Sequence, residues 1–468
     1  MADGALVERL RQYLKDLPPN ARALLMSELE RAVLSGEDMP GAELVLQQLR
    51  REARDTTRVQ RPGNLARLFF QPLEPFLVDD VATHHHPGRI ARVTLEPIWE
   101  WIGRDLMPGE AKAVTEQVAS AFERGEAARA EELAYAFQDR AVMRMEETLN
   151  IAASDEKLRR RLTGQIGTPR ALDDVAAVAT VLKSRHLLSI FGARLPSHIK
   201  SLDEPTVGSV KALIDSPAAG GQKLFLYKLV MVLSRLGAPW QLIRLATRAA
   251  GSDNTLRISE TPYAVAVEIV LAEMERMVGE LKAELRTGRG LATGALLKSI
   301  HDSARGLRTE IDLAHDSPWS RRLAALRSEV SDLLKGEIES LNGRVRRLLR
   351  PRPTKEIAPN STLDQGDLSD TESLIEFVGA CRAYASELAV NELTSRTWSE
   401  LEQYLGTAST ALVENLRHAG PADRDFRQSQ LDAAVRFCAK VFGDDYAQVL
   451  VKAGDSAAGG ERKTAAKA

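Results

Sequence analysis

The sequence predicts an all-α fold made of irregular multi-helical layers, a long antiparallel helical bundle or coiled-coil arm, and a small C-terminal helical subdomain. Helix starts are marked by a capping residue followed by proline, the preferred first helical residue, at Thr168-Pro169, Thr261-Pro262 and Ser317-Pro318. Apolar residues recur every three or four positions over long stretches, which is typical of amphipathic helices. The sequence shows no run of alternating, β-branched residues that would predict a strand.

The composition indicates a protein with packed cores and no dominant surface charge. The chain has 468 residues, 44% of them hydrophobic, with 63 Lys and Arg against 65 Asp and Glu. This balance argues against a surface built wholly to hold nucleic acid, so nucleic acid is the least favoured partner. Cys381 and Cys438 form no CxxC pair, so neither a disulfide framework nor a structural zinc site is expected.

The sequence is not expected to contain a secretion signal or a membrane span. Its first residues carry charges every few positions instead of the apolar core of a signal peptide. The most apolar stretch, Leu224 to Leu233, is ten residues long and contains Lys228, whereas a span needs about 20 apolar residues. We therefore expect a cytoplasmic protein without a transmembrane segment, whose contact with a membrane would be peripheral.

Residues 1–60 are expected to form N-terminal helices, with Asn20 as an N-cap and Gly36 just past a helix end. A tandem repeat unit follows at 61–110, with nearly the same phrase at 63–80 (GNLARLFFQPLEPFLVDD) and 88–105 (GRIARVTLEPIWEWIGRD). In each phrase proline should start a helix with apolar residues at i, i+3 and i+4. We expect two copies packed apolar face to apolar face about an approximate two-fold axis. The facing residues would be Leu73, Phe76 and Leu77 in one copy and Ile98, Trp101 and Ile102 in the other.

The phrases also share two polar pairs, Arg67 with Arg92 and Asp80 with Asp105. In a repeat that only builds a core, these residues would be equivalent ion-pairing or capping positions. In the alternative, both arginines face an anionic ligand in a shared cleft, and the region is the pocket of an enzyme or ligand-binding protein.

Residues 111–255 are expected to form layers of helical pairs. The clearest pair ends one helix at Gly237, starts the next at Pro239 and ends it at Gly251. So short a connection makes neighbouring helices antiparallel. One longer helix should run from Pro169 to Gly192.

Residues 262–350 are expected to form a long three-helix bundle or coiled-coil arm. Their three apolar stripes need partners, which favours packing on one another over a stripe left open for a partner helix or a second copy of the chain. The stripes are Val267, Leu271, Met274, Val278, Leu281 and Leu285; Leu297, Ile300, Ala304, Leu307, Ile311 and Ala314; and Leu323, Leu326, Val330, Leu334, Ile338, Leu341, Val345 and Leu348.

Residues 351–369 contain three prolines and few apolar residues, which predicts a linker. A C-terminal helical subdomain is expected at 370–453, opened by a capping box of Ser369 and Glu372. The small and polar residues of 454–468 predict a disordered tail.

Two clusters could carry chemistry. His84, His85 and His86 are candidate metal ligands, but adjacent histidines in one loop seldom reach one ion, and a solvated loop is the favoured alternative. The second cluster could bind an anionic partner, although cations at a helix end also complement the helix dipole. It consists of Arg344, Arg346, Arg347, Arg350, Arg352 and Lys355.

No motif in the sequence identifies a reaction. It contains no HExxH or GxSxG motif, and 288–299 lacks the GK[ST] ending of a phosphate loop, so we assign no catalytic residue and no cofactor. We predict a helical scaffold or adaptor that binds a protein partner through helical surfaces, with self-association through 262–350 as an option. The alternatives are a peripheral regulator that uses the basic cluster on a phospholipid, acidic protein or nucleic acid, and an enzyme with a pocket at 61–110.

Overall fold

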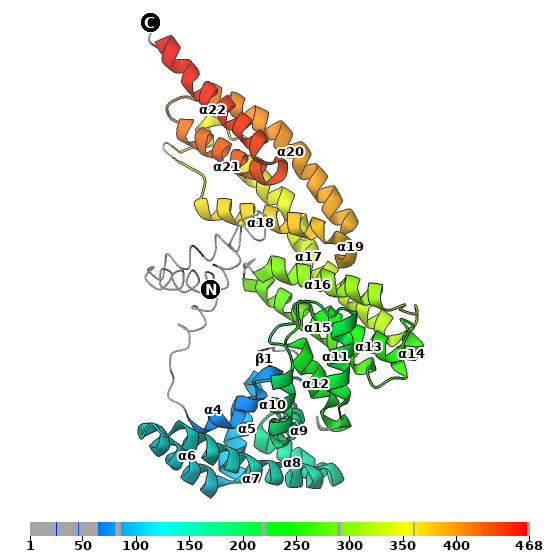
Figure 1. The fold of residues 1–468 in the computed structure, drawn as a ribbon. Coiled ribbons are helices and arrows are strands. Elements are labelled where there is room, and N and C mark those ends of the chain that lie inside the picture. Colours follow the sequence, from blue (N-terminus) through cyan, green and yellow to red (C-terminus); the bar gives the residue numbers. More distant parts are fainter. Residues whose placement is uncertain are drawn as a thin grey trace, which may run out of the picture. The chain divides into compact units, whose positions relative to one another are not determined.

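The computed structural model describes residues 64–79, 86–216, 221–287, 292–358 and 361–465, together with the single helical positions Leu25 and Val45. Within these residues the protein is all-α, as predicted: helices α4 to α22 are joined by short 3-10 turns and one two-residue strand pair (Figure 1). Apart from Leu25 and Val45, the N-terminal helices predicted at 1–60 lie outside the described residues.

The chain forms two compact units. Unit 1 comprises the described residues up to Gly279 together with Asp302–Arg321, and unit 2 comprises Glu280–His301 and the residues from Arg322 onward. The chain therefore passes between the units three times, each time within or next to a long helix. These helices are α15 (Ala264–Thr287), α16 (Ala292–Glu310) and α17 (Pro318–Leu349).

The three long helices were predicted as an arm of their own at 262–350, but their residues are divided between the two units. The predicted stripes are nevertheless buried within the chain: every position of the third stripe is covered, Leu285 is half-buried, and Ala314 is exposed beyond the end of α16. Periodicity gives the buried face of a helix without giving its neighbour, which is why the stripes were predicted correctly and the domain boundary was not. Among the described stripe positions, no continuous apolar face is left open for a second copy.

Unit 1 begins with short elements and continues in helices of 5 to 28 residues. The α-helices are α4 (Leu65–Phe70), α5 (Leu95–Trp101), α6 (Pro108–Glu123), α7 (Ala127–Ser154), α8 (Glu156–Ile166), α9 (Pro169–Lys183), α10 (Arg185–Arg194), α11 (Glu204–Asp215), α12 (Phe225–Leu233), α13 (Ile243–Ala250) and α14 (Thr255–Ser259). The 3-10 turns are Gln71–Phe76, Arg92–Thr94, Gln222–Leu224 and Pro239–Leu242, and Ile102–Leu106 forms a π-turn. Helix α6 packs on α7, and α7 packs on α9 (Figure 1).

The predicted helix punctuation is confirmed in part: α9 and α17 begin at Pro169 and Pro318, whereas α15 begins at Ala264, after Pro262, and α12 ends at Leu233, before Gly237. Thr168 accepts a hydrogen bond from the backbone N of Ala171 at 3.1 Å, and α9 begins at Pro169. The helix does not reach Gly192, because it stops at Lys183 and the chain turns by 69° into α10. Gly251 ends α13 in the left-handed conformation that glycine adopts without strain.

The two phrases of the tandem repeat unit fold differently, which corrects the predicted two-fold pair. Residues 65–70 are α-helical, whereas the aligned residues 90–95 hold strand β2 (Ile90–Ala91) and a 3-10 turn. Strand β1 (Leu77–Val78) runs parallel to β2, with Leu77 opposite Ile90. The predicted facing residues are buried except for half-buried Leu77, but the aromatic contact between the phrases is made by Phe69 and Phe70 with Trp99.

Buried polar side chains hold the two phrases in place. Asp174 of α9 is 0% exposed and accepts hydrogen bonds from the backbone N of Ala91 (3.1 Å) and the hydroxyl of Thr94 (2.7 Å). Gln138 of α7 donates to the backbone oxygens of Leu68 and Phe69 at the end of α4. The phrases are therefore positioned by α7 and α9, two helices outside the repeat, and only in part by each other.

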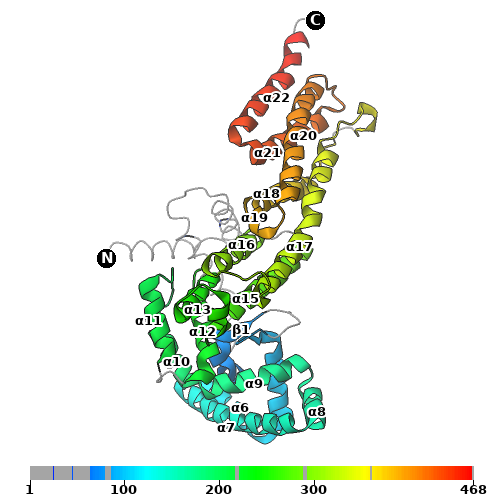
Figure 2. The ribbon, with the colours of Figure 1, turned by 90° about the vertical axis from the view of Figure 1, so that its right-hand side faces the viewer.

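Unit 2 contains the C-terminal helices, in which α20, α21 and α22 pack against one another and α18 packs on α20 and α21 (Figure 2). Their bounds are α18 (Gln365–Ala383), α19 (Ala385–Leu388), α20 (Asn391–Arg417), α21 (Arg424–Phe442) and α22 (Asp444–Ala465). Helix α18 begins at Gln365, where Asp364 accepts from the backbone N of Asp367, so the predicted cap at Ser369 is one turn too late. The predicted disordered tail is wrong for residues 454–465, which continue α22.

The segment predicted as a linker at 351–369 is fixed to α21 in its first part. Gln430, which is fully buried, donates to the backbone oxygens of Leu348 and Arg350, each at 3.0 Å. Arg427 donates to the backbone oxygen of Arg352 at 2.6 Å. These bonds satisfy carbonyls that the end of α17 leaves without helical partners, so this stretch is part of the subdomain.

Candidate functional site

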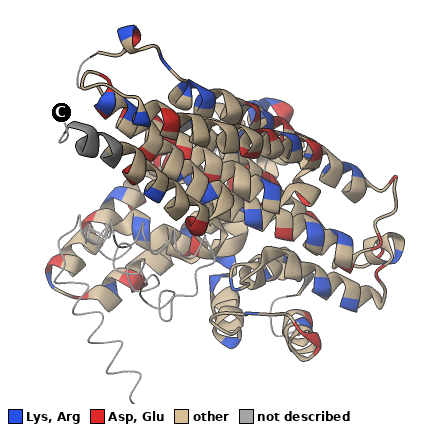
Figure 3. Ribbon diagram, turned by 90° about the horizontal axis from the view of Figure 1, so that it is seen from above, with Lys and Arg blue, Asp and Glu red and all other residues tan. Residues whose placement is uncertain are grey.

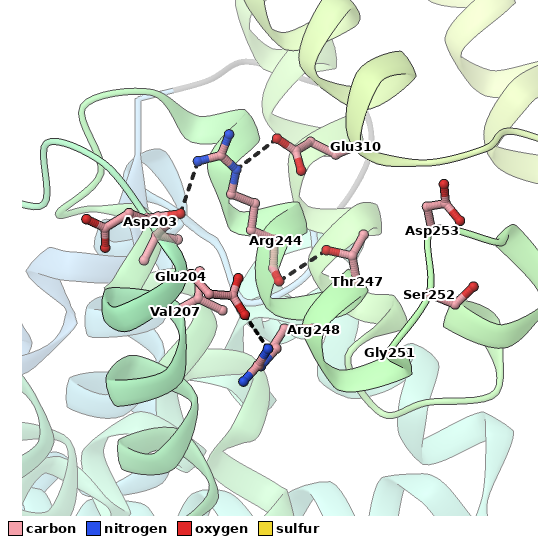
Figure 4. Close-up of a pocket in the computed structure, with 11 residues that line it drawn as sticks. Asp203, Glu204, Val207, Arg244, Thr247, Arg248, Gly251, Ser252, Asp253 and Glu310 are labelled. Carbon is pink, nitrogen blue, oxygen red and sulfur yellow. Dashed lines mark hydrogen bonds and ion pairs between the residues drawn. The ribbon is translucent and has the colours of Figure 1, made fainter.

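Unit 1 contains two pockets of similar size and opposite character. We call the first the polar pocket: it has a volume of about 530 Å³ and lies between α11, α13 and the end of α16 (Figure 4). Its lining residues are Leu202, Asp203, Glu204, Val207, Arg244, Thr247, Arg248, Gly251, Ser252, Asp253 and Glu310. We call the second the apolar groove: it has a volume of about 560 Å³ and is lined by Gln71, Pro72, Pro75, Phe76, Tyr135, Arg185, His186, Leu188, Ser189 and Met231.

Arg244 is the centre of the polar pocket. Its guanidinium donates to the carboxylate of Glu310 at 2.8 Å and to the backbone oxygen of Leu202 at 3.0 Å (Figure 4). It also lies over the ring of Trp240, 5.1 Å from the ring centroid. Trp240 in turn packs against Gly306 of α16, where an added Cβ would stand 2.6 Å from two ring atoms. Arg244 therefore joins α13 to α16 and to the segment before α11.

The remaining charges of the polar pocket are also engaged or exposed. Arg248 pairs with Glu204 of α11. Asp203 caps α11, and its pKa lies below its ordinary value because the hydroxyl and backbone N–H of Thr206 donate to its carboxylate. Asp253 is exposed. Because both arginines are neutralised by glutamates of the same pocket, the site offers little to an anionic ligand and acts as a joint between helices.

The apolar groove has a covered floor and an amphipathic rim. Phe76, Leu188 and Met231 form the floor and are at most 7% exposed. On the rim, the guanidinium of Arg185 lies over the ring of Tyr135 at 5.3 Å. Arg185 is held there by Asp139 at 2.6 Å and by the backbone oxygen of Leu182 at 3.0 Å. This fixed pair of an aromatic ring and a guanidinium is the kind of surface that partners bind most strongly.

The groove was not predicted, since its walls come from parts of the chain far apart in sequence. Pro72, Pro75 and Phe76 belong to the first phrase of the repeat unit, whereas the other walls come from α7, α10 and α12. Neither Arg67 nor Arg92, the two arginines of the predicted cleft, lines the polar pocket or the apolar groove. Arg92 pairs with Asp79 at 2.6 Å and Glu74 at 3.3 Å.

Asp80 and Asp105 are the other polar pair that the two phrases share. Asp105 pairs with its neighbour Arg104 at 2.7 Å. Asp80, its counterpart in the first phrase, lies outside the described residues, so only one member of the pair can be placed.

The histidine loop gives no metal site within the described residues, where no group of three potential ligands comes together. His84 and His85 lie outside those residues. His86 is 5% exposed, and its Nδ1 lies 3.8 Å from a carboxylate oxygen of Glu275. Nearby, Glu273 binds both Arg276 at 2.6 Å and Arg89 at 3.5 Å, so His86 belongs to a buried charge cluster that anchors α15 within unit 1.

The basic cluster of unit 2 is divided by contacts within the chain. Arg346 lies over the ring of Tyr404, Arg347 pairs with Asp367 at 3.0 Å, and Arg352 lies over the ring of Phe426. Arg344 is half-buried, while Arg350 and Lys355 are exposed. Over the described helices as a whole, lysines and arginines are interspersed with acidic residues (Figure 3). The stretch 344–355 itself contains no Asp or Glu, and three of its six cations are engaged by the contacts above.

The other side chains that could act as nucleophiles, two thiols and an amine, are buried within the fold. Cys381 and Cys438 are free but buried, and burial raises the pKa of each thiol to about 12. Lys228 is 2% exposed and donates to the backbone oxygen of Ile214 at 2.8 Å, near the end of α11. Burial lowers the pKa of this ammonium, and its position at a helix C-terminus gives it a structural role.

No single helix in the described part of the chain is long and apolar enough to span a membrane, although the bent pair α9 and α10 passes that test together on length and composition. Comparison with protein-family models, with curated proteins and with solved structures found no match to this chain. The site is therefore interpreted from its own geometry.

Proposed function

We propose that this protein is a helical scaffold or adaptor and that the apolar groove of unit 1 is a docking site for a protein partner. The observation that carries this proposal is the groove itself: a volume of about 560 Å³ with a floor of Phe76, Leu188 and Met231 and a rim of Tyr135 and Arg185. The apolar surface still open to water lies on the rim, where Tyr135 is 38% exposed, and its removal from water contributes about 25 cal/mol per Å².

The rim supports binding because it is already ordered. A side chain that must be immobilised on binding costs about 0.5–1.5 kcal/mol, which is avoided when its position is fixed beforehand. Arg185 has three such restraints, namely Asp139, the backbone oxygen of Leu182 and the ring of Tyr135. Prolines at Pro72 and Pro75 stiffen the opposite wall.

The two alternative functions have weaker support. The enzyme alternative needed Arg67 or Arg92 in a pocket beside a titratable group, and neither arginine lines the polar pocket or the apolar groove. The anionic-surface alternative needed a continuous basic cluster at 344–355, and half of its cations are engaged within unit 2. Neither alternative is favoured by an observation of its own.

A substitution that plugs the groove tests the proposal. Ser189 is exposed on the groove side of α10, so Ser189→Trp fills the groove without removing a buried contact. Ser209→Trp, at an exposed helical serine of α11, is the matched control. In affinity capture from native lysate, a partner that wild type and Ser209→Trp enrich equally should be lost on Ser189→Trp. Equal capture by all three would refute the groove as the docking site.

A further inference from the structure

We infer that the segment bound by the apolar groove is a short acidic peptide or helix with apolar anchor residues. This inference rests on the proposed docking function and adds the chemistry of the partner. It depends on two independent features of α10 and its surroundings, the sign of the charges around the groove and the arrangement of exposed apolar residues beside it.

The charged lining of the groove is positive. No carboxylate lines it, and its only charged lining residue is Arg185, next to His186. The stretch 183–200 contains Lys183, Arg185, Arg194 and Lys200 and no Asp or Glu. A partner with carboxylates would meet complementary charge along this stretch, and a basic partner would be repelled.

The cations differ in how far they are already neutralised. Lys183 pairs with Glu146 at 2.8 Å, and Arg185 pairs with Asp139 at 2.6 Å, both on α7. Arg194 and Lys200 are exposed, and no carboxylate in the described residues pairs with them. The uncompensated positive charge therefore lies at the C-terminal end of α10 and just beyond it.

The apolar part of the surface continues from the groove along α10. His186, Ser189, Ile190 and Ala193 follow the i, i+3, i+4, i+7 pattern of one helix face, and the first two line the groove. Ile190 is 40% exposed, and Leu187 beside it is 37% exposed. A partner with apolar residues one helical turn apart could place one in the groove and the next on Ile190.

A peptide fits these features better than a lipid surface does. The apolar floor is concave, with Phe76, Leu188 and Met231 below the rim, whereas a membrane-binding helix presents its apolar residues outward. Arg185 on the rim is already paired with Asp139, so the carboxylates of a peptide would pair with Arg194 and Lys200, at the end of α10 and just beyond it.

Selection from a random peptide-display library on the full-length chain tests the inference. The library is enriched on wild type and depleted on Ser189→Trp. Selected peptides should carry a net negative charge together with apolar residues. A synthetic copy of one should bind Arg194→Glu about tenfold more weakly than wild type, which corresponds to 1.4 kcal/mol. Arg161→Glu, which reverses an exposed arginine on α8, should bind as wild type does.

The outcomes separate the two proposals. Peptides that are lost on Ser189→Trp but show no excess of Asp and Glu would overturn the acidic partner and leave the groove as a docking site. A library in which nothing distinguishes wild type from Ser189→Trp would overturn both. Sedimentation of the chain with phosphatidylserine vesicles, abolished by Leu187→Ser/Ile190→Ser and unaffected by Ser189→Trp, would assign this face to a membrane and overturn the peptide.

Discussion

The polar pocket and the apolar groove belong to the same unit and differ little in volume, about 530 against about 560 Å³. In the polar pocket, Arg244 and Arg248 are bound to Glu310 and Glu204, so its strongest groups already have partners. In the groove, the floor of Phe76, Leu188 and Met231 is covered by the chain, but the apolar side chains of Leu187 and Ile190 beside it are 37% and 40% exposed. The volume of a pocket is therefore a poor guide to whether it binds a partner. The free energy that its lining residues would gain from a partner is a better guide.

The largest effect is expected from breaking the polar pocket at its centre. Arg244→Ala would leave Glu310, 19% exposed, without its cation and remove the stack on Trp240. We expect a loss of about 2–3 kcal/mol in the free energy of unfolding, measured by urea denaturation followed by circular dichroism.

Arg248→Ala is the matched control for that change. Its partner Glu204 is 72% exposed, and exposed ion pairs contribute less than about 1 kcal/mol. If Arg244→Ala and Arg248→Ala both lowered the free energy of unfolding by less than about 1 kcal/mol, the polar pocket would not be a joint between helices. Its contrast with the groove would then disappear.

The next largest effect on stability is expected from substituting two glycines, Gly306 and Gly192. An added Cβ at Gly306 would stand 2.6 Å from the rigid ring of Trp240, and one at Gly192 would stand 2.7 Å from the flexible end of Met231. Gly306→Ala should therefore destabilise by about 1–3 kcal/mol through overpacking. Gly192→Ala should change stability by less than about 1 kcal/mol, because alanine favours the helix and the methionine can move.

The same denaturation experiment measures both glycine variants. Equal destabilisation by the two would mean that the floor of the groove is as rigid as the joint, and the groove would then adapt poorly to a bound residue.

The smallest effect is expected in the stability of the protein at low pH. Asp203 has a lowered pKa in the folded chain, so its contribution to stability is present above the pKa of the unfolded state and is lost as pH falls through the folded value. Asp203→Asn keeps a side chain that can cap α11 but cannot titrate. Between about pH 5 and pH 2, wild type should therefore lose stability more steeply than Asp203→Asn.

Thermal unfolding followed across this range makes the comparison. Identical slopes for wild type and variant would show that the hydrogen bonds from Thr206 do not persist in solution. The groove, which no carboxylate lines, has no counterpart to this effect.

The helices could be predicted from the sequence, since capping residues and apolar spacing are local signals. Thr168 and Gly251 mark the ends that the structure shows, and the stripe from Leu323 to Leu348 is buried throughout. The tail was mispredicted because small residues were taken as a sign of disorder. At Gly454 the absence of a side chain lets α22 approach Leu431 closely, and Ala457 is buried.

The groove and the division into units could not be predicted, because both depend on contacts between distant segments. Met231 and Pro72 meet only after α12 has packed on the turn at 71–76. The two-fold pair was mispredicted for a related reason: the similar residues at 63–80 and 88–105 have different neighbours. In the second phrase, Asp174 accepts hydrogen bonds from Ala91 and Thr94.

The three passages of the chain between the units have a consequence for how this protein can be divided or recombined. No single cut releases one unit whole, because Asp302–Arg321 belongs to the first unit while Glu280–His301 belongs to the second. A gene fusion or exon exchange at any one point would therefore leave part of one unit on the same fragment as the other unit.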